Sequence, residues 1–221
     1  MTPYFQHGNI TIYHGDAREL IHLGAIAHAS ILDPPYVLAT KGGGLSAKRA
    51  YHGEIKSAKI DEGFDFNLLR KLGGWMCFCS KAQLLRLIML SSSRAGYKWM
   101  PLFWGKTNPT PLTNNVYLPD CEYIIHSYAS GRLFGEYKDK SRFYISKQER
   151  EFSHPTVKPV SLMMKLVSLS TQPGEIVFDP FLGTGSTLVA AKLLGRGGIG
   201  IEREEKWCEV AAQRLSQEAL L

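Results

Sequence analysis

The chain has 221 residues, a length that suits one large domain, and its hydrophobic fraction of 44% supports a buried core and excludes wholesale disorder. No apolar run approaches the roughly 20 residues that cross a bilayer, and residues 1–16 lack a basic-then-apolar signal, so we expect a soluble, intracellular protein. The 26 Lys and Arg residues against 20 Asp and Glu give a net charge of +6, which alone only hints at a polyanionic partner.

Strand-like and helix-like segments alternate along the chain. The apolar runs predict strands over residues 10–16, 30–32, 75–80, 97–106, 122–129, 175–180 and 197–202. Helical spacing predicts helices over residues 17–28, 64–73, 82–96, 160–174, 186–197 and 204–221. This alternation is typical of an α/β protein in which a doubly wound, mostly parallel sheet has helices on both faces. The irregular residues 107–153 are the best candidate for an insertion.

The four cysteines do not have the spacing of zinc ligands, so the sequence predicts no metal site. Cys77 and Cys79 occupy alternate positions of one predicted strand and are expected on the same face of the sheet. We interpret all four as small buried side chains in a reducing compartment.

The stretch SILDPPY, residues 30–36, ends a short apolar strand with an aspartate and two prolines. Pro34 and Pro35 cannot donate to a sheet ladder, so the strand stops there and leaves Asp33 at its carboxyl end. Ligands of open α/β sheets bind at that edge. Taken alone, these residues fit a strand followed by a proline turn about as well as they fit a binding site.

A second strand, residues 175–180, leads through Phe181, Gly183 and Gly185 into a predicted helix. Glycines at this point let a ligand approach the backbone and leave the N–H groups of the helix available. A dinucleotide fingerprint would need glycine or alanine at position 188, which is leucine here. Glu202 ends the next predicted strand, where an acid can bind both hydroxyls of a ribose. Loop and acid together favour an adenosyl ligand over a dinucleotide.

DPPY at 33–36 followed by FDPFLGTGST at 178–187 resembles the β group of the S-adenosylmethionine-dependent DNA amino-methyltransferases, in which the motifs have this order. HPTVKP at 154–159, GIEREEKW at 200–207 and ITIYHGDAREL at 10–20 resemble further segments of that group, so the resemblance spans most of the chain. It implies a single Rossmann-like methyltransferase domain over 1–221 with seven strands in permuted order, a small inserted target-recognition region, and S-adenosylmethionine as cofactor.

The resemblance also implies roles for particular residues. Asp33 and the carbonyl of Pro34 would hold the two N–H groups of an exocyclic amine, with Pro35 stiffening the turn and Tyr36 stacking on the flipped base. The residues assigned to the cofactor are Asp16, Lys158, Asp179, Pro180, Phe181, Gly183, Thr184, Gly185, Ser186 and Glu202. Among these, Asp16 would contact the adenine and Lys158 the methionine carboxylate, although a strand-end cap and a solvated lysine explain them about as well. His154 is interpreted as a polar loop residue rather than as a contact.

Two basic segments that also carry aromatic residues are expected to follow a phosphate backbone. The first lies in residues 37–60, which we expect to be a mobile DNA-contacting loop, and the second spans residues 131–150. The DNA-binding candidates are Lys41, Lys48, Arg49, Lys56, Lys59, Arg132, Lys138, Lys140 and Arg142. A solvated loop is the alternative for either segment.

The favoured function is methylation of the N6 amine of adenine. The chain has Asp33 at the first position of the DPPY tetrad, 33–36, where the cytosine-N4 enzymes of the family more often have serine. Cytosine N4 is the alternative, followed by an RNA or protein-amide methyltransferase and by a catalytically dead nucleic-acid-binding module. Double-stranded DNA in the cytoplasm of a bacterial or phage-infected cell is the expected partner. The sequence leaves open a homodimer, a partner restriction nuclease and the recognised DNA word.

Overall fold

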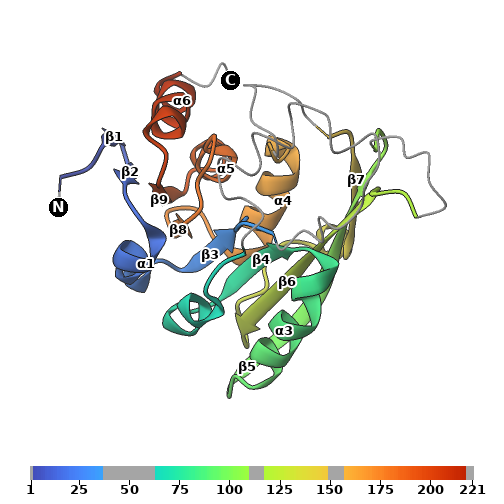
Figure 1. Cartoon of the computed structure of the whole chain (residues 1–221). Helices are drawn as coiled ribbons and strands as arrows, with labels where there is room; N and C mark the ends of the chain where they lie inside the picture. Colours follow the sequence, from blue (N-terminus) through green and yellow to red (C-terminus); the bar gives the residue numbers. More distant parts are fainter. Residues whose placement is uncertain (1, 37–62, 110–116, 149–156, 218–221) are drawn as a thin grey trace.

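The computed structural model describes residues 2–36, 63–109, 117–148 and 157–217, and the strands in these ranges form one nine-stranded sheet of order β1-β2-β9-β8-β3-β4-β6-β5-β7 (Figure 1). The strands are β1 (Phe5–His7), β2 (Ile10–His14), β3 (Ala29–Leu32), β4 (Trp75–Cys79), β5 (Tyr97–Lys106), β6 (Cys121–Ala129), β7 (Phe143–Ser146), β8 (Ile176–Asp179) and β9 (Gly197–Glu202). The α-helices are α1 (Ala17–Leu20), α3 (Lys81–Ser92), α4 (Val160–Ser170), α5 (Ser186–Leu193) and α6 (Glu205–Ser216). The 3₁₀-helices are η1 (Ile21–Ile26), η3 (Phe66–Lys71) and η4 (Tyr137–Lys140).

The predicted fold class is confirmed, with one short strand added at each edge of the sheet. The seven predicted strands correspond to β2, β3, β4, β5, β6, β8 and β9. Sequence patterns missed β1, which pairs antiparallel with β2, and β7, which pairs parallel with β5. Edge strands of three or four residues carry too short an apolar pattern to stand out.

Helices cover both faces of the sheet, with α4, α5 and α6 on one side and α1 and α3 on the other (Figure 1). Side chains of β4 alternate between the two cores: Met76 and Phe78 pack on the side of α4, whereas Trp75, Cys77 and Cys79 pack on the side of α3. The two cysteines therefore share a face, as their parity predicts. Strands buried on both faces read as continuous apolar runs, which is why β3 and β4 are easy to find in the sequence. Within the described ranges, no helix combines the length and the apolar character that a membrane span needs.

Neighbouring strands β3 and β8 form the switch point of the sheet. They run parallel, with Ser30 opposite Phe178, but the chain continues from β3 toward β4 and from β8 toward β9, in opposite directions. Such a divergence opens a crevice at the carboxyl ends of the two strands. The tetrad at 33–36 and the loop at 180–185 therefore meet, although they lie far apart in the sequence.

The predicted insertion over residues 107–153 does not have the expected boundaries. Its central part is β6, which pairs antiparallel with both β4 and β5 and belongs to the body of the sheet. The strand-like pattern at 122–129 already indicated this, but the range around it was grouped by its irregular composition. Residues 110–116 and 149–153, like the whole of the predicted DNA-contacting loop at 37–60, lie outside the described residues.

Candidate active site

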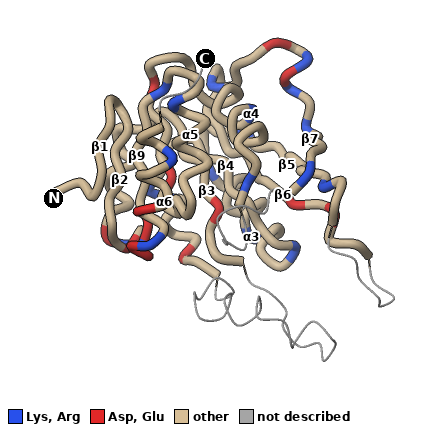
Figure 2. The backbone as a smooth tube through the Cα atoms, turned by 90° about the horizontal axis from the view of Figure 1, so that it is seen from above, with Lys and Arg blue, Asp and Glu red and all other residues tan. Residues whose placement is uncertain are grey.

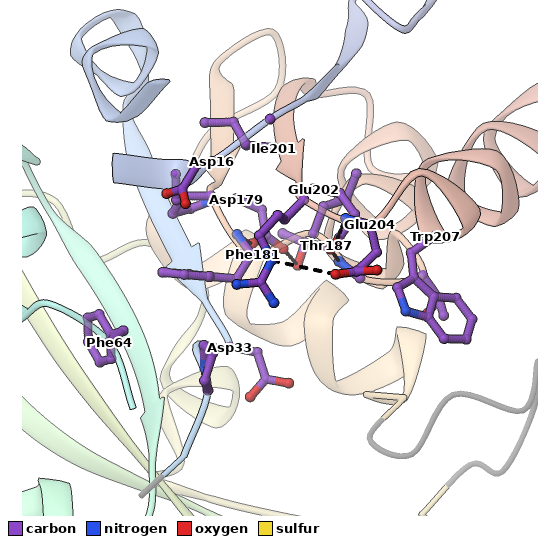
Figure 3. A pocket seen from close by; sticks show the side chains of 18 of the residues that line it. Asp16, Asp33, Phe64, Asp179, Phe181, Thr187, Ile201, Glu202, Glu204 and Trp207 are labelled. Carbon is purple, nitrogen blue, oxygen red and sulfur yellow. Dashed lines mark hydrogen bonds and ion pairs between the residues drawn. The ribbon is translucent and has the colours of Figure 1, made fainter. Parts of the chain in front are cut away.

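A cavity of about 490 Å³ lies at the carboxyl edge of the sheet, where β3, β8 and β9 end. Asp33, Asp179 and Glu202 surround it from these three strand ends (Figure 3). The residues assigned to the cofactor all line this cavity except Gly185, and from the tetrad Asp33 and Pro35 line it. Its volume falls in the range of sites for small organic ligands. The two main sequence motifs therefore form the walls of one site.

Asp33 is held by two donors. The Nζ atom of Lys158 lies 2.5 Å from Oδ2, and the hydroxyl of Tyr36 lies 2.9 Å from Oδ1. Burial raises the pKa of Asp33, and the Lys158 ammonium opposes that rise by favouring the carboxylate. Burial disfavours the charged amine of Lys158, which is 6% exposed, but Asp33 and Glu122 overcompensate and the pKa of Lys158 is raised. Lys158, expected at the methionine carboxylate, is thus already paired with Asp33.

Glu122, on β6, completes this cluster, and sequence reasoning missed it. Its Oε1 lies 2.6 Å from Nζ of Lys106, and its Oε2 lies 3.0 Å from the hydroxyl of Tyr36 and 3.4 Å from Nζ of Lys158. Burial would raise the pKa of Glu122, but the two lysines bring it below the ordinary value. A signal was present, because a lysine ends one predicted strand and a glutamate begins the next.

Gln83 of α3 holds the backbone of the tetrad in place. Its side chain is 2% exposed, its Nε2 donates to the carbonyl of Pro35 at 3.1 Å, and its Oε1 accepts from the N–H of Ser80 at 3.0 Å. Tyr36 does not line the cavity, because its ring packs against the core under α4. In this structure the ring of Tyr36 is therefore not placed to stack on a base in the cavity.

The glycine loop and Glu202 are joined by backbone hydrogen bonds. The N–H of Gly183 donates to Oε2 of Glu202 at 2.8 Å, and the N–H of Glu204 donates to Oε1 at 2.8 Å. Burial raises the pKa of Glu202 in spite of these bonds. Gly185 packs against α6: its φ is +84°, and a Cβ there would lie 2.9 Å from the Cβ of Ala211 in α6. Glycine at 185 is thus required by helix packing, and it does not face the cavity.

Asp179 is 2% exposed at the end of β8. It accepts from the N–H of Phe181 at 3.0 Å and from the hydroxyl of Thr187 at 2.5 Å. Burial raises the pKa of Asp179 to about 7, with the charges of Asp33 and Glu202 adding to the effect. The carboxyl is thus on the border between neutral and charged at physiological pH.

Asp16 caps α1 and lines the cavity. Arg18 binds both of its carboxylate oxygens, with Nη2 at 2.6 Å from Oδ2 and Nε at 3.0 Å from Oδ1. These hydrogen bonds lower the pKa of Asp16. Arg18 also lines the cavity and was not singled out from the sequence. Throughout the described ranges, no group of three or more His, Cys, Asp or Glu side chains could hold a metal ion.

Arg132, a predicted DNA contact, lies away from the cavity and is paired with Glu175. Arg132 follows β6, which is antiparallel to β4 and so ends at the amino edge of the sheet, away from the cavity. There its guanidinium donates to both carboxylate oxygens of Glu175 at 2.8 Å each and lowers the pKa of Glu175 to about 2. The ion pair joins the end of β6 to the start of β8, which is a structural role.

Lys138, Lys140 and Arg142 do not line the cavity. They precede β7, whose first residue pairs with Phe103 of β5. Acidic and basic positions alternate along this segment (Figure 2), and Lys138 pairs with Glu136 at 3.1 Å. The other candidates, Lys41, Lys48, Arg49, Lys56 and Lys59, lie outside the described residues, as does His154.

Comparisons with known proteins agree on one family. Residues 27–213 match the N6/N4 family described as DNA methylase. The type II methyltransferase M2.LlaDCHI of Lactococcus lactis subsp. cremoris is 26% identical over 256 residues, which cover 98% of this chain and 93% of the relative.

Solved structures of DNA methyltransferases are similar to this chain as well. The crystal structure of the M1.HpyAVI–SAM complex superposes with a TM-score of 0.68 and 29% identity, covering 93% of this chain and 99% of that one. The cytosine-N4-specific PvuII DNA methyltransferase has a TM-score of 0.70 at 15% identity, covering 99% of this chain and 90% of that one, and shows the shared fold alone.

Proposed function

This chain belongs to the DNA methylase family, and from that premise we propose that it methylates the N6 amine of adenine in DNA, with S-adenosylmethionine as the methyl donor. The observation that supports the proposal most directly is the shared cavity. The acceptor Asp33 and the adenosyl-type loop with Glu202 line the same space at the switch point of the sheet.

The cavity suits S-adenosylmethionine in size and in chemistry. Each carboxylate oxygen of Glu202 accepts one backbone N–H and keeps a lone pair for a ribose hydroxyl. Phe181 and Ile201 offer apolar surface to an adenine, while Asp33, Asp179 and Glu202 give the cavity an acidic lining that favours a cation. When bound, the cofactor supplies an electrophilic methyl group on a positively charged sulfur.

The residues of the chain then prepare the nucleophile. The lone pair of an exocyclic amine is delocalised into the base, so the amine is a poor nucleophile until acceptors at its N–H groups localise that pair. Asp33 offers such an acceptor, and its backbone is fixed by two prolines and by Gln83. Pairing in the duplex hides the amine, so the base must be extruded to reach this carboxylate. Catalysis then rests on positioning and electrostatics, with Asp33 as the acceptor of the proton that leaves the methylated nitrogen.

The choice of adenine over cytosine rests on the first residue of the tetrad. Asp33 is typical of the adenine enzymes that this chain resembles, and the N4-cytosine alternative shares the geometry of the amine. The test is to incubate the protein with labelled cofactor and duplex DNA, digest the product to nucleosides and separate them. We expect label in N6-methyl-2′-deoxyadenosine from the DNA, with RNA and bulk protein unlabelled. Label in N4-methylcytosine, in RNA or in protein, or no transfer at all, would overturn the assignment.

The setting follows from the same premise. DNA is the partner of this family, and the type II designation of its relatives supports a restriction–modification context in a bacterial or phage-infected cytoplasm. A homodimer and an accompanying nuclease are part of this proposal. Light scattering of the purified protein tests the dimer, and cleavage of unmethylated DNA by lysate of the source cell tests the nuclease.

A further inference from the structure

A cluster of buried charges lies behind the acceptor Asp33. Asp33 follows β3, Lys106 ends β5, Glu122 lies on β6, and Lys158 and Tyr36 lie between them. The cluster holds two carboxylates and two ammonium groups. Asp33 and Lys158 line the cavity, whereas Glu122 and Lys106 do not.

Stability alone does not explain Glu122. Taking an ion pair out of water costs several kcal/mol per ion, and a well-packed apolar pair of similar volume is often as stable or more so. The Glu122 side chain is 15% exposed and that of Lys106 is 11% exposed, so both pay this cost. A buried ion pair directly behind a reactive carboxylate is better explained by what it does to that carboxylate.

The geometry presents a conflict at Asp33 that Glu122 can resolve. An incoming amine needs an oxygen of Asp33 as acceptor, and each oxygen already accepts one hydrogen bond, Oδ2 from Lys158 at 2.5 Å and Oδ1 from the hydroxyl of Tyr36 at 2.9 Å. Each oxygen keeps a lone pair for the amine, but the two donors weaken it as an acceptor. Both donors also reach one atom of Glu122, because Oε2 lies 3.4 Å from Lys158 and 3.0 Å from Tyr36. The Tyr36 hydroxyl has one proton and two carboxylates within reach, so it can donate to only one of them.

Lys106 leaves the right oxygen of Glu122 available. It binds Oε1 at 2.6 Å, and Oε2 is the atom that faces Lys158 and Tyr36. The second ammonium also keeps Glu122 ionised, so that Glu122 is a strong acceptor even while Asp33 holds both donors. Asp33 and Glu122 are thus alternative acceptors for the one proton of Tyr36, and they share the ammonium of Lys158, which has three N–H groups.

We propose that Glu122, held by Lys106, is a positioning residue that takes the hydrogen bonds of Lys158 and Tyr36 when the substrate amine binds Asp33. Lys158 then remains close enough to keep Asp33 ionised, while the oxygen that binds the amine becomes a stronger acceptor. This inference rests on the proposed amine methylation and adds the residue that exposes the acceptor. Glu122 acts through Lys158 and Tyr36 and touches neither substrate nor cofactor.

The test uses Glu122→Gln, which keeps the shape of the side chain and removes its charge, and Glu136→Gln as a control from the exposed pair with Lys138. We expect the single-turnover rate of methyl transfer to fall about 10- to 100-fold in Glu122→Gln, because Lys158 stays on Asp33. Cofactor affinity should change less than about twofold. The Glu136→Gln control should match the wild type in both.

The titration of Asp33 shows whether the charge of Glu122 acts on this carboxyl. The charged and titratable groups that face it are Lys158, Glu122, Tyr36, Cys77 and Asp179. Removing the negative charge of Glu122 should shift the acid limb of the pH–rate profile to lower pH, and Lys158→Met should shift it to higher pH. Carbon-13 NMR of the Asp33 carboxyl in the ligand-free protein, assigned with Asp33→Asn, should show the same opposite shifts.

The outcomes separate this inference from the proposed function. A wild-type protein that methylates no DNA amine refutes the proposed function. An active wild type with a wild-type rate in Glu122→Gln refutes only the inference. A slower Glu122→Gln whose Asp33 titration does not move also refutes it, since the loss then comes from disturbed packing.

Discussion

Asp179 makes the stability of the protein depend on pH in a defined direction. The ordinary pKa of an aspartate is 3.8, and burial raises that of Asp179 to about 7. The folded state therefore holds this proton more tightly than the unfolded state, so stability is greatest below the unfolded pKa and is lost as the pH rises through about 7. The shift corresponds to about 4 kcal/mol in total, of which about 3 kcal/mol falls between about pH 5 and about pH 8.

The measurement is urea unfolding of the wild type and of Asp179→Asn across that pH range. Titrations common to both proteins cancel in the difference, and an exposed-carboxyl variant, Asp120→Asn, serves as control. We expect the free energy of unfolding of the wild type to fall by about 3 kcal/mol relative to Asp179→Asn as the pH rises, and not relative to Asp120→Asn. A difference between wild type and Asp179→Asn that stays constant with pH would refute the reasoning.

Two further predictions concern Gly185 and Arg132. Gly185→Ala should cost about 2–4 kcal/mol of unfolding free energy, because its φ is +84° and the new Cβ would lie 2.9 Å from that of Ala211. Gly174→Ala, with φ +82° and no atom within 4 Å, should cost only about 1 kcal/mol in the same urea titration, and equal losses would contradict the packing argument. Arg132→Met should cost about 1–2 kcal/mol above pH 4.5, an effect that disappears as the pH falls through about 2, the pKa of Glu175. DNA affinity of Arg132→Met, measured by fluorescence anisotropy, should change less than about twofold, and a marked loss would return Arg132 to the DNA-binding surface.

The sequence predicted well those features that depend on residues adjacent in the chain. Pro34 and Pro35 end the strand because prolines lack a backbone donor. The position of Asp33 at a strand end therefore followed from the DPPY motif alone. The glycines at 183 and 185 marked the turn between β8 and α5 in the same way. Parallel strands buried on both faces gave continuous apolar runs, and these fixed the order of elements.

The features that were missed depend on how distant strands are arranged. Glu122 reaches Lys158 only because β6 lies antiparallel between β4 and β5, and no local pattern reports that placement. Because β6 runs antiparallel to β4, Arg132, which follows it, lies at the amino edge of the sheet. The basic and aromatic residues near Arg132 in the sequence had predicted a DNA contact there. Composition gives the charge of a segment, but topology decides which edge of the sheet the charge occupies.

The most direct measurement for the whole account compares methyl transfer and cofactor binding in Asp33→Asn. Calorimetry should show S-adenosylmethionine affinity within about threefold of the wild type, while the single-turnover rate on DNA falls at least about 100-fold because the amine loses its charged acceptor. A variant that binds the cofactor and still methylates DNA at close to the wild-type rate would contradict the role of Asp33 and with it the mechanism.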